Sequence, residues 1–155
     1  MPFSTDGVYT IRNVGRDLLL DLRDFHTTEG NTIQVWHNNS SVAQQWVVKQ
    51  QYGPVSSNKT VTIQSSINGS NGNGFFAAAT QDSDEPVVYT RQAFIVDLVP
   101  REDDTYTISY TLGDPNLVIS IPSATHYEAK LENHVSGTSR QQWEFTRVAD
   151  LQPVV

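Results

Sequence analysis

A glutamine-x-aromatic motif that recurs at nearly constant spacing is the strongest constraint on the fold of this chain. It stands at residues 44–46 (Gln-Gln-Trp), 92–94 (Gln-Ala-Phe) and 141–143 (Gln-Gln-Trp), so its aromatic residues are 48 and 49 positions apart. Each unit also opens on a similar β-type segment, at residues 8–11, 60–63 and 105–108. Two landmarks that repeat in the same order predict three repeats, at roughly residues 7–51, 58–100 and 104–148.

Short runs rich in Val, Ile, Thr and Tyr make up the segments between these landmarks. Gly, Asn, Asp and Pro separate the runs, and no stretch keeps a helical period, which predicts an all-β protein. The expected strands cover residues 8–13, 18–23, 32–36, 45–50, 61–65, 75–79, 87–89, 94–99, 106–110, 117–121, 128–131 and 143–147. These twelve strands correspond to four per repeat.

Length and composition limit the classes of function. With 155 residues and no cysteine, the sequence predicts one domain (residues 1–155) that is stabilised by an apolar core rather than by disulfides. A formal charge of −7 argues against nucleic-acid binding, which requires clustered Lys and Arg. The sequence contains no signal peptide and no apolar run of about 18 residues. We therefore expect a cytoplasmic protein without membrane insertion, or one released by an unconventional route.

The sequence also lacks catalytic and metal-binding motifs. The four histidines, at positions 26, 37, 126 and 134, do not have the spacing of metal ligands. No nucleophile elbow and no phosphate-binding loop occurs. We therefore expect a protein that is not an enzyme and that uses no metal or other cofactor.

The repeated motif resembles that of the ricin B-type lectins, whose β-trefoil repeats carry Gln-x-Trp. The resemblance covers essentially the whole chain and is strongest in the first repeat. It implies a carbohydrate-binding β-trefoil in which Trp46, Phe94 and Trp143 pack in a shared core. Without cysteines or a signal peptide, the chain is most similar to small cytosolic lectins of mushroom-forming fungi, which implies a role in fungal defence.

Asp21 is the first candidate for a sugar-binding residue. It lies near the end of the expected strand 18–23 and precedes a polar loop that begins at Asp24. A carboxylate held by a strand can accept hydrogen bonds from two neighbouring hydroxyl groups of one sugar. A local turn contact with nearby amides is the alternative role for such a residue.

Trp36 follows Asp21 by fifteen residues, at the end of the next expected strand, with Gln34 on the same strand face. Galactose-binding members of the resembled family have an Asp in a comparable Leu-Asp-Leu-Arg context and an aromatic residue that ends the following strand. The resemblance implies that Asp21 binds hydroxyl groups, that Trp36 stacks on the sugar and that Gln34 supports Asp21. Core packing is the alternative role for Trp36.

Amides and donors around this pair complete the expected site. By the same resemblance Gln44 is the neighbouring amide, whereas Ala43 replaces the asparagine that the family has directly before Gln-x-Trp. We expect His37 or one of the two following asparagines, among them Asn39, to replace that amide. Arg23 is a further candidate donor, with a solvated side chain as the alternative.

The other two repeats have a less favourable composition. Alignment of the first and third repeats places Ser120 and Glu132 at the positions of the first-repeat carboxylate and aromatic, which predicts neither an acceptor nor a stacking surface. Residues 75–79 of the middle repeat include no carboxylate. Tyr127 is the one reason to consider a sugar site in the third repeat. We therefore expect one sugar site, in the first repeat.

The expected ligand is a glycan or glycoprotein with terminal galactosyl residues. A carboxylate above an aromatic ring suits galactose, whose axial 4-hydroxyl leaves one ring face apolar. The resemblance implies galactose or N-acetylgalactosamine, often in N-acetyllactosamine-type chains. One monosaccharide gives an affinity of about 0.1 to 1 mM, so extended glycans or a homodimer would increase avidity. The sequence does not indicate whether a dimer forms.

A protease inhibitor is the alternative function, because some β-trefoils present an exposed loop to a protease. The basic residues that such a loop would use are Arg16, Arg101 and Lys130. None of the three has a distinctive local sequence, and surface Lys and Arg are ordinarily solvated.

Overall fold

The computed structural model describes residues 5–51, 59–67, 73–78, 83–91, 94–110 and 116–151, with the backbone alone for 73–78. Its strands are β1 (Gly7–Asn13), β2 (Leu18–Leu22), β3 (Ile33–Trp36), β4 (Trp46–Gln50), β5 (Lys59–Ser65), β6 (Asn73–Ala78), β7 (Val87–Thr90), β8 (Val96–Pro100), β9 (Tyr106–Tyr110), β10 (Leu117–Ser120), β11 (Lys130–Asn133) and β12 (Trp143–Ala149). Short 3-10 helices lie at η1 (Arg23–Phe25), η2 (Val42–Gln44), η3 (Glu102–Asp104) and η4 (Ser139–Gln141). None of the helices in these ranges is long and apolar enough to cross a membrane.

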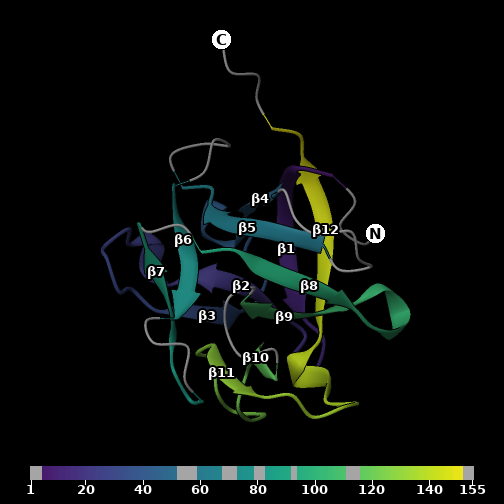
Figure 1. Cartoon of the computed structure of the whole chain (residues 1–155). Coiled ribbons are helices and arrows are strands. Elements are labelled where there is room, and N and C mark those ends of the chain that lie inside the picture. The colour runs from purple at the N-terminus through teal and green to yellow at the C-terminus, as the bar shows by residue number, and fades with distance from the viewer. Residues whose placement is uncertain are drawn as a thin grey trace.

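Six of these strands close into an antiparallel barrel (Figure 1). Strand β1 pairs with β4 and β12, β4 with β5, β5 with β8, β8 with β9, and β9 with β12, which completes the ring. A closed ring has no free edges, so the barrel strands satisfy one another's backbone hydrogen bonds.

The remaining strands form three hairpins, β2–β3, β6–β7 and β10–β11. Isolated bridges join each hairpin region to the other two, through the pairs Thr32–Val88, Gln34–Glu128 and Pro86–Lys130. A barrel of six strands with three interlinked hairpins is a β-trefoil-like arrangement. It brings residues 126–130, from the far end of the sequence, directly beside β3.

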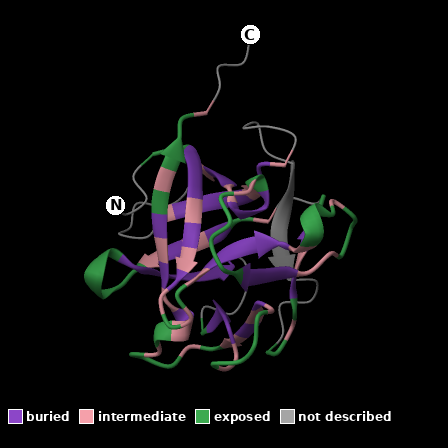
Figure 2. Ribbon diagram, turned by 180° about the vertical axis from the view of Figure 1, so that it is seen from behind, coloured by how far each residue is buried: buried purple, intermediate pink, exposed green. Residues whose placement is uncertain are grey.

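The aromatic residues of the repeated motif mark the core. Buried residues run along the barrel strands (Figure 2). Trp46 and Trp143 are fully buried, and Phe94 is half-buried against the core, edge-on to Tyr110. The two tryptophans make the same contact: the indole Nε1 of Trp46 donates to the carbonyl of Leu20 and that of Trp143 to the carbonyl of Ile119, each at 3.0 Å. The core role expected for these two tryptophans is confirmed. Gln92 lies outside the described residues.

Most expected strands are present with ends shifted by one or two residues, but the eleventh is displaced. The sequence predicts it at 128–131, whereas β11 covers 130–133. Residues 128 and 129 pair with β3 instead, since the amide of Ala129 donates to the carbonyl of Ile33 at 3.0 Å. The sequence pattern does not show whether this segment pairs with β3 or with β10. The predicted strand therefore begins two residues too early.

Candidate functional site

The predicted first-repeat residues surround a pocket of about 550 Å³ at the β2–β3 hairpin. Its lining comprises Asp21, Arg23, Asp24, Phe25, Gln34, Trp36 and Asn39. Five of the seven predicted site residues are therefore brought together at its surface. Gln44 and His37 are not in the lining.

Asp21 lines the pocket from β2, directly opposite Gln34 of β3. Its side chain is almost completely buried, with 5% of the residue exposed. Gln44 Nε2 donates to Asp21 Oδ2 at 3.1 Å, and Gln34 Nε2 approaches Oδ1 at 3.4 Å. Burial raises the pKa of the Asp21 carboxyl above its usual value, and the two amide hydrogen bonds oppose that shift.

Arg23 orients Gln34 and is itself held by Glu128. Arg23, which follows β2, donates from Nε to Gln34 Oε1 at 3.0 Å and pairs through Nη2 with Glu128 at 3.2 Å. Because its oxygen is occupied by Arg23, the Gln34 amide turns its nitrogen toward Asp21. Arg23 therefore positions the site as well as lining it, a role that sequence reasoning did not assign.

Gln44 acts from beneath the pocket. It is 1% exposed, and besides holding Asp21 it donates to the carbonyl of His37 at 2.7 Å and accepts from the amide of Asn39 at 3.1 Å. The same side chain thus fixes the carboxylate and the loop after β3. Gln44 therefore supports Asp21 from within the protein and does not itself line the pocket.

Trp36 ends β3 and is 37% exposed, which excludes the alternative of a core residue. Its ring centroid lies 5.0 Å from that of Tyr127 and 5.3 Å from that of His37. Tyr127, which we considered for the third repeat, therefore lies beside the first-repeat site. The guanidinium of Arg16 lies 4.9 Å from the Tyr127 ring centroid, and Arg16 also donates to the carbonyl of His126.

These contacts bear on the protease-inhibitor alternative. An inhibitory basic residue has to present its side chain to the protease, whereas that of Arg16 is held against the protein. Arg101 donates from Nε to Thr107 at 3.2 Å, and Lys130 lies within β11, where it pairs with Ser120. Each of the three candidate residues is therefore held by a contact within the protein, rather than presented on a loop to a protease.

Asn39 is the side-chain amide at the pocket that could replace the asparagine missing at Ala43. Ala43 is buried within η2, whereas Asn39 is exposed and lines the pocket. The Asn39 Oδ1 atom accepts from the amide of Ser41 at 3.0 Å, and its Nδ2 group is a further donor at this pocket residue. The His37 side chain contacts Trp36 instead.

Sequence reasoning missed Asp24 and Phe25, which also line the pocket. Both have positive φ, 54° and 62°. The other non-glycine residues with positive φ in the described ranges are Asp or Ser, whose short polar side chains tolerate this conformation. Phe25 is bulky and is also 49% exposed. An aromatic residue within a polar loop was the sequence signal that could have revealed it.

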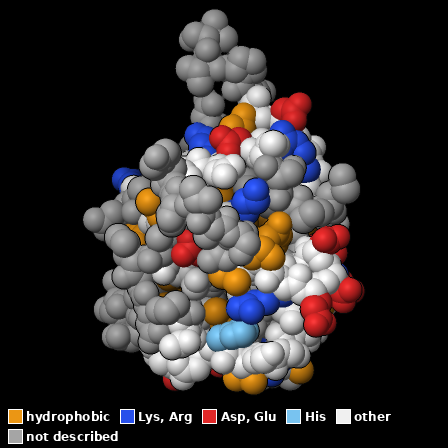
Figure 3. Space-filling model, turned by 45° about the vertical axis from the view of Figure 1, so that its right-hand side comes forward, with side chains coloured by type: hydrophobic (Ala, Val, Ile, Leu, Met, Phe, Trp, Pro, Cys, Tyr) orange, Lys and Arg blue, Asp and Glu red, His pale blue; other side chains and the backbone are white. Residues whose placement is uncertain are grey.

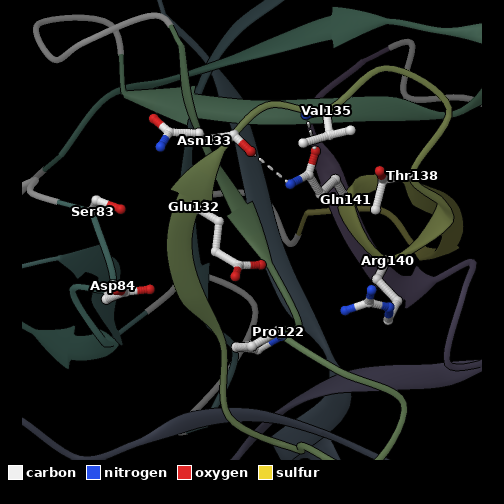
Figure 4. Close-up of a pocket in the computed structure, with 9 residues that line it drawn as sticks. All are labelled: Ser83, Asp84, Pro122, Glu132, Asn133, Val135, Thr138, Arg140 and Gln141. Atoms are coloured by element: carbon white, nitrogen blue, oxygen red, sulfur yellow. Dashed lines mark hydrogen bonds between the residues drawn. The ribbon is translucent and has the colours of Figure 1, made fainter.

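The third repeat has a pocket of about 370 Å³ that differs in chemistry (Figure 4). Ser120 Oγ donates to Glu132 Oε1 at 2.5 Å, and the Glu132 side chain points into the pocket between Asp84 and Arg140. The expectation that this repeat lacks an acceptor is therefore wrong, because Glu132 supplies a carboxylate from the opposite strand. The expected loss of the stacking surface agrees with a lining that contains no aromatic residue.

Gln141 repeats the backbone contacts of Gln44 in this third pocket. It accepts from the amide of Val135 at 2.9 Å and donates to the carbonyl of Asn133 at 3.0 Å (Figure 4). The scaffold of the first site is therefore retained in a repeat that has lost the Asp–Trp pair. The middle-repeat residues 75–79 cannot be compared, since their side chains lie outside the described part of the chain.

The charges on the surface are mixed. On the face seen in Figure 3, acidic and basic side chains are interspersed rather than gathered in one basic patch. Within the described ranges no group of three or more His, Cys, Asp or Glu side chains is arranged to hold a metal ion.

The barrel and its three hairpins define an all-β protein of β-trefoil type. The chain belongs to the ricin-type beta-trefoil lectin domain-like family, whose sequence model matches residues 3–81. No curated protein matches the sequence.

Solved structures similar to this chain include two fungal lectins. The Rhizoctonia solani agglutinin has a TM-score of 0.81 and 21% identity, over 96% of this chain and 100% of that one. The Macrolepiota procera ricin B-like lectin, solved in complex with lactose, has a TM-score of 0.77 and 18% identity, over 96% and 100%. The designed threefold-symmetric protein ThreeFoil has a TM-score of 0.77 and 14% identity, over 92% and 100%. At these identities the likeness establishes the fold, and the family membership supports carbohydrate binding.

Proposed function

We propose that this protein is a lectin that binds terminal galactose or N-acetylgalactosamine, as in N-acetyllactosamine-type glycans, through the first-repeat pocket. The observation that carries the proposal is the buried Asp21 carboxylate, held by two amides beside the exposed ring of Trp36. A fixed carboxylate accepts hydrogen bonds from neighbouring hydroxyl groups, and the aromatic ring covers the apolar face of the sugar. Asn39 and Arg23 supply donors at the rim.

We further propose that binding is non-enzymatic and uses this one site, within a fold of twelve strands in three repeats. The matching indole contacts of Trp46 and Trp143 support the repeat, and the lectin complexed with lactose among the similar structures supports a galactoside ligand. We also propose a role in fungal defence, which the resemblance implies, a cytoplasmic location, which the lack of a signal peptide suggests, and a homodimer, which would raise the avidity of a protein with one site.

Retention on immobilised galactose, with lactose as competitor, tests the proposal. Asp21→Ala should abolish retention, whereas Glu132→Ala, which removes the third-pocket carboxylate, should leave it unchanged. The free energy of unfolding of Asp21→Ala should change by only about 1 kcal/mol, because losing an acceptor for two amides is offset by removing a buried charge. Retention of Asp21→Ala, or loss with Glu132→Ala, would place the site elsewhere.

A further inference from the structure

The two exposed aromatic residues of the first-repeat pocket come from opposite ends of the β2–β3 hairpin. Trp36 pairs with Leu19 at one end of the β2–β3 hairpin. At the other end, the last pair of the two strands is Leu22 with Ile33, and the chain then continues to Phe25. Three residues of strand separate these levels, a distance of about 10 Å. Asp21 lies between them. A single pyranose ring that contacts Trp36 and Asp21 does not extend to Phe25.

The size of the pocket agrees with a ligand longer than one ring. Its volume of about 550 Å³ lies within the range of about 300 to 1,000 Å³ that accommodates drug-sized ligands, which are comparable to two linked sugar rings. Asp24 and Arg23, at the Phe25 end, provide an acceptor and a donor for further hydroxyl groups. The second half of the pocket thus has the same mixture of aromatic and polar groups as the first.

The backbone at Phe25 gives an independent reason to assign it a role. Its φ of 62° is costly for a bulky L-residue and would suit glycine. The ring is 49% exposed, so core burial does not account for a phenylalanine at this position. Strained residues cluster at ligand sites, where the side chain is needed in a fixed place.

We propose that Phe25 is a specificity-determining residue that packs against the second sugar of a galactoside, so that the site recognises a disaccharide unit rather than a monosaccharide. The inference rests on the proposed function, since it assumes that the terminal galactosyl ring occupies the Trp36 end. Contact with an aromatic ring should favour the disaccharide about three- to tenfold.

The test compares the affinities of lactose and methyl β-galactoside by calorimetry for the wild type and two variants. Phe25→Gly removes the ring and relieves the positive φ, so its thermal stability should not decrease. It should lose the preference for lactose, because its affinity for lactose falls more than its affinity for methyl β-galactoside. Phe25→Tyr keeps the ring and should keep the preference.

The possible outcomes separate this inference from the proposed function. A wild type that binds neither galactoside overturns both. A wild type without a preference for lactose, or a Phe25→Gly variant that keeps it, overturns the inference alone. Equal weakening of both ligands in Phe25→Gly also overturns it, because the ring would then maintain the site rather than contact the second sugar.

Discussion

Gln44 Nε2 donates to Asp21 Oδ2 at 3.1 Å, and two residues further along the same motif Trp46 donates to the carbonyl of Leu20 at 3.0 Å. Leu20 directly precedes Asp21 on β2. One Gln-x-Trp motif therefore fixes both the backbone that carries the carboxylate and the carboxylate itself. The motif that marks the fold also positions the candidate ligand group.

Replacement of Gln44 by Ala should reduce both stability and sugar binding. The free energy of unfolding should fall by about 1 to 3 kcal/mol, because the amide of Asn39 and the carbonyl of His37 lose their partner. Gln141→Ala is the matched control. Gln141 makes the same two kinds of backbone contact as Gln44, but its amide does not hold a carboxylate. It should lower stability similarly and leave binding unchanged. Denaturant unfolding and lactose calorimetry would measure the two effects, and unchanged binding in Gln44→Ala would show that Asp21 needs no such support.

Trp36→Ala should weaken binding of galactosides by roughly tenfold, since stacking on an aromatic ring contributes about 0.5 to 1.5 kcal/mol beyond the area it buries. Stability should change little, because the ring is exposed. Tyr127→Ala is the control: Tyr127 contacts Trp36 but does not line the pocket. Calorimetry on both variants distinguishes a stacking ring from its neighbour, and an equal loss in the two would mean that the aromatic pair acts as a unit.

Binding should weaken as the pH falls through the raised pKa of Asp21, because a protonated carboxyl loses acceptor capacity. The charge of Asp24 adds to this upward shift of the Asp21 pKa, and His37 opposes it. The contribution of Asp21 to folding has the opposite sign. Its pKa is higher in the folded state, so burying the charge costs stability at neutral pH and that cost disappears as the pH falls.

Calorimetry of lactose binding between pH 3.5 and 7, together with NMR titration of the Asp21 carboxyl, would check this. Sugar hydroxyl groups should stabilise the charged form, so binding near the raised pKa should release protons. Affinity that stays constant through the titration of Asp21 would contradict its role as the acceptor.

Trp46→Phe and Trp143→Phe should destabilise the fold to a similar extent, about 1 to 3 kcal/mol each, because both leave a buried carbonyl without its indole donor. Thermal unfolding measures this, and a large difference between the two variants would argue against equivalent repeats. Trp46→Phe should in addition weaken lactose binding, since Leu20 adjoins Asp21. Trp143→Phe should not.

Sequence reasoning succeeded where a residue's role follows from local spacing. The recurring Gln-x-aromatic motif predicted the buried positions of Trp46 and Trp143, and the pattern of residues 18–23 placed Asp21 near the end of a strand. The contact of Asp21 with Gln34 was implied by the family resemblance. These features depend on contacts within one hairpin or on the side-chain period of a strand.

Contacts between repeats were beyond the reach of the same reasoning. Tyr127 lies beside Trp36 and Glu128 pairs with Arg23, although more than 80 residues separate the members of each pair in the sequence. The loop after Asp24 was expected, but the place of Phe25 in the pocket was missed, because a bulky residue at positive φ contradicts local preference. The carboxylate of the third pocket was missed because Glu132 comes from the strand opposite the expected position.

The retention of the Gln141 and Trp143 contacts around an altered third pocket has a consequence for how such proteins diversify. The bonds of Gln141 and Trp143 end on backbone atoms, whereas the groups that differ between the two pockets are other side chains, Asp21 and Trp36 in the first and Glu132 in the third. A lineage with this architecture can therefore exchange the specificity of one pocket, or abandon it, while the other pockets and the common barrel continue under unchanged selection for folding.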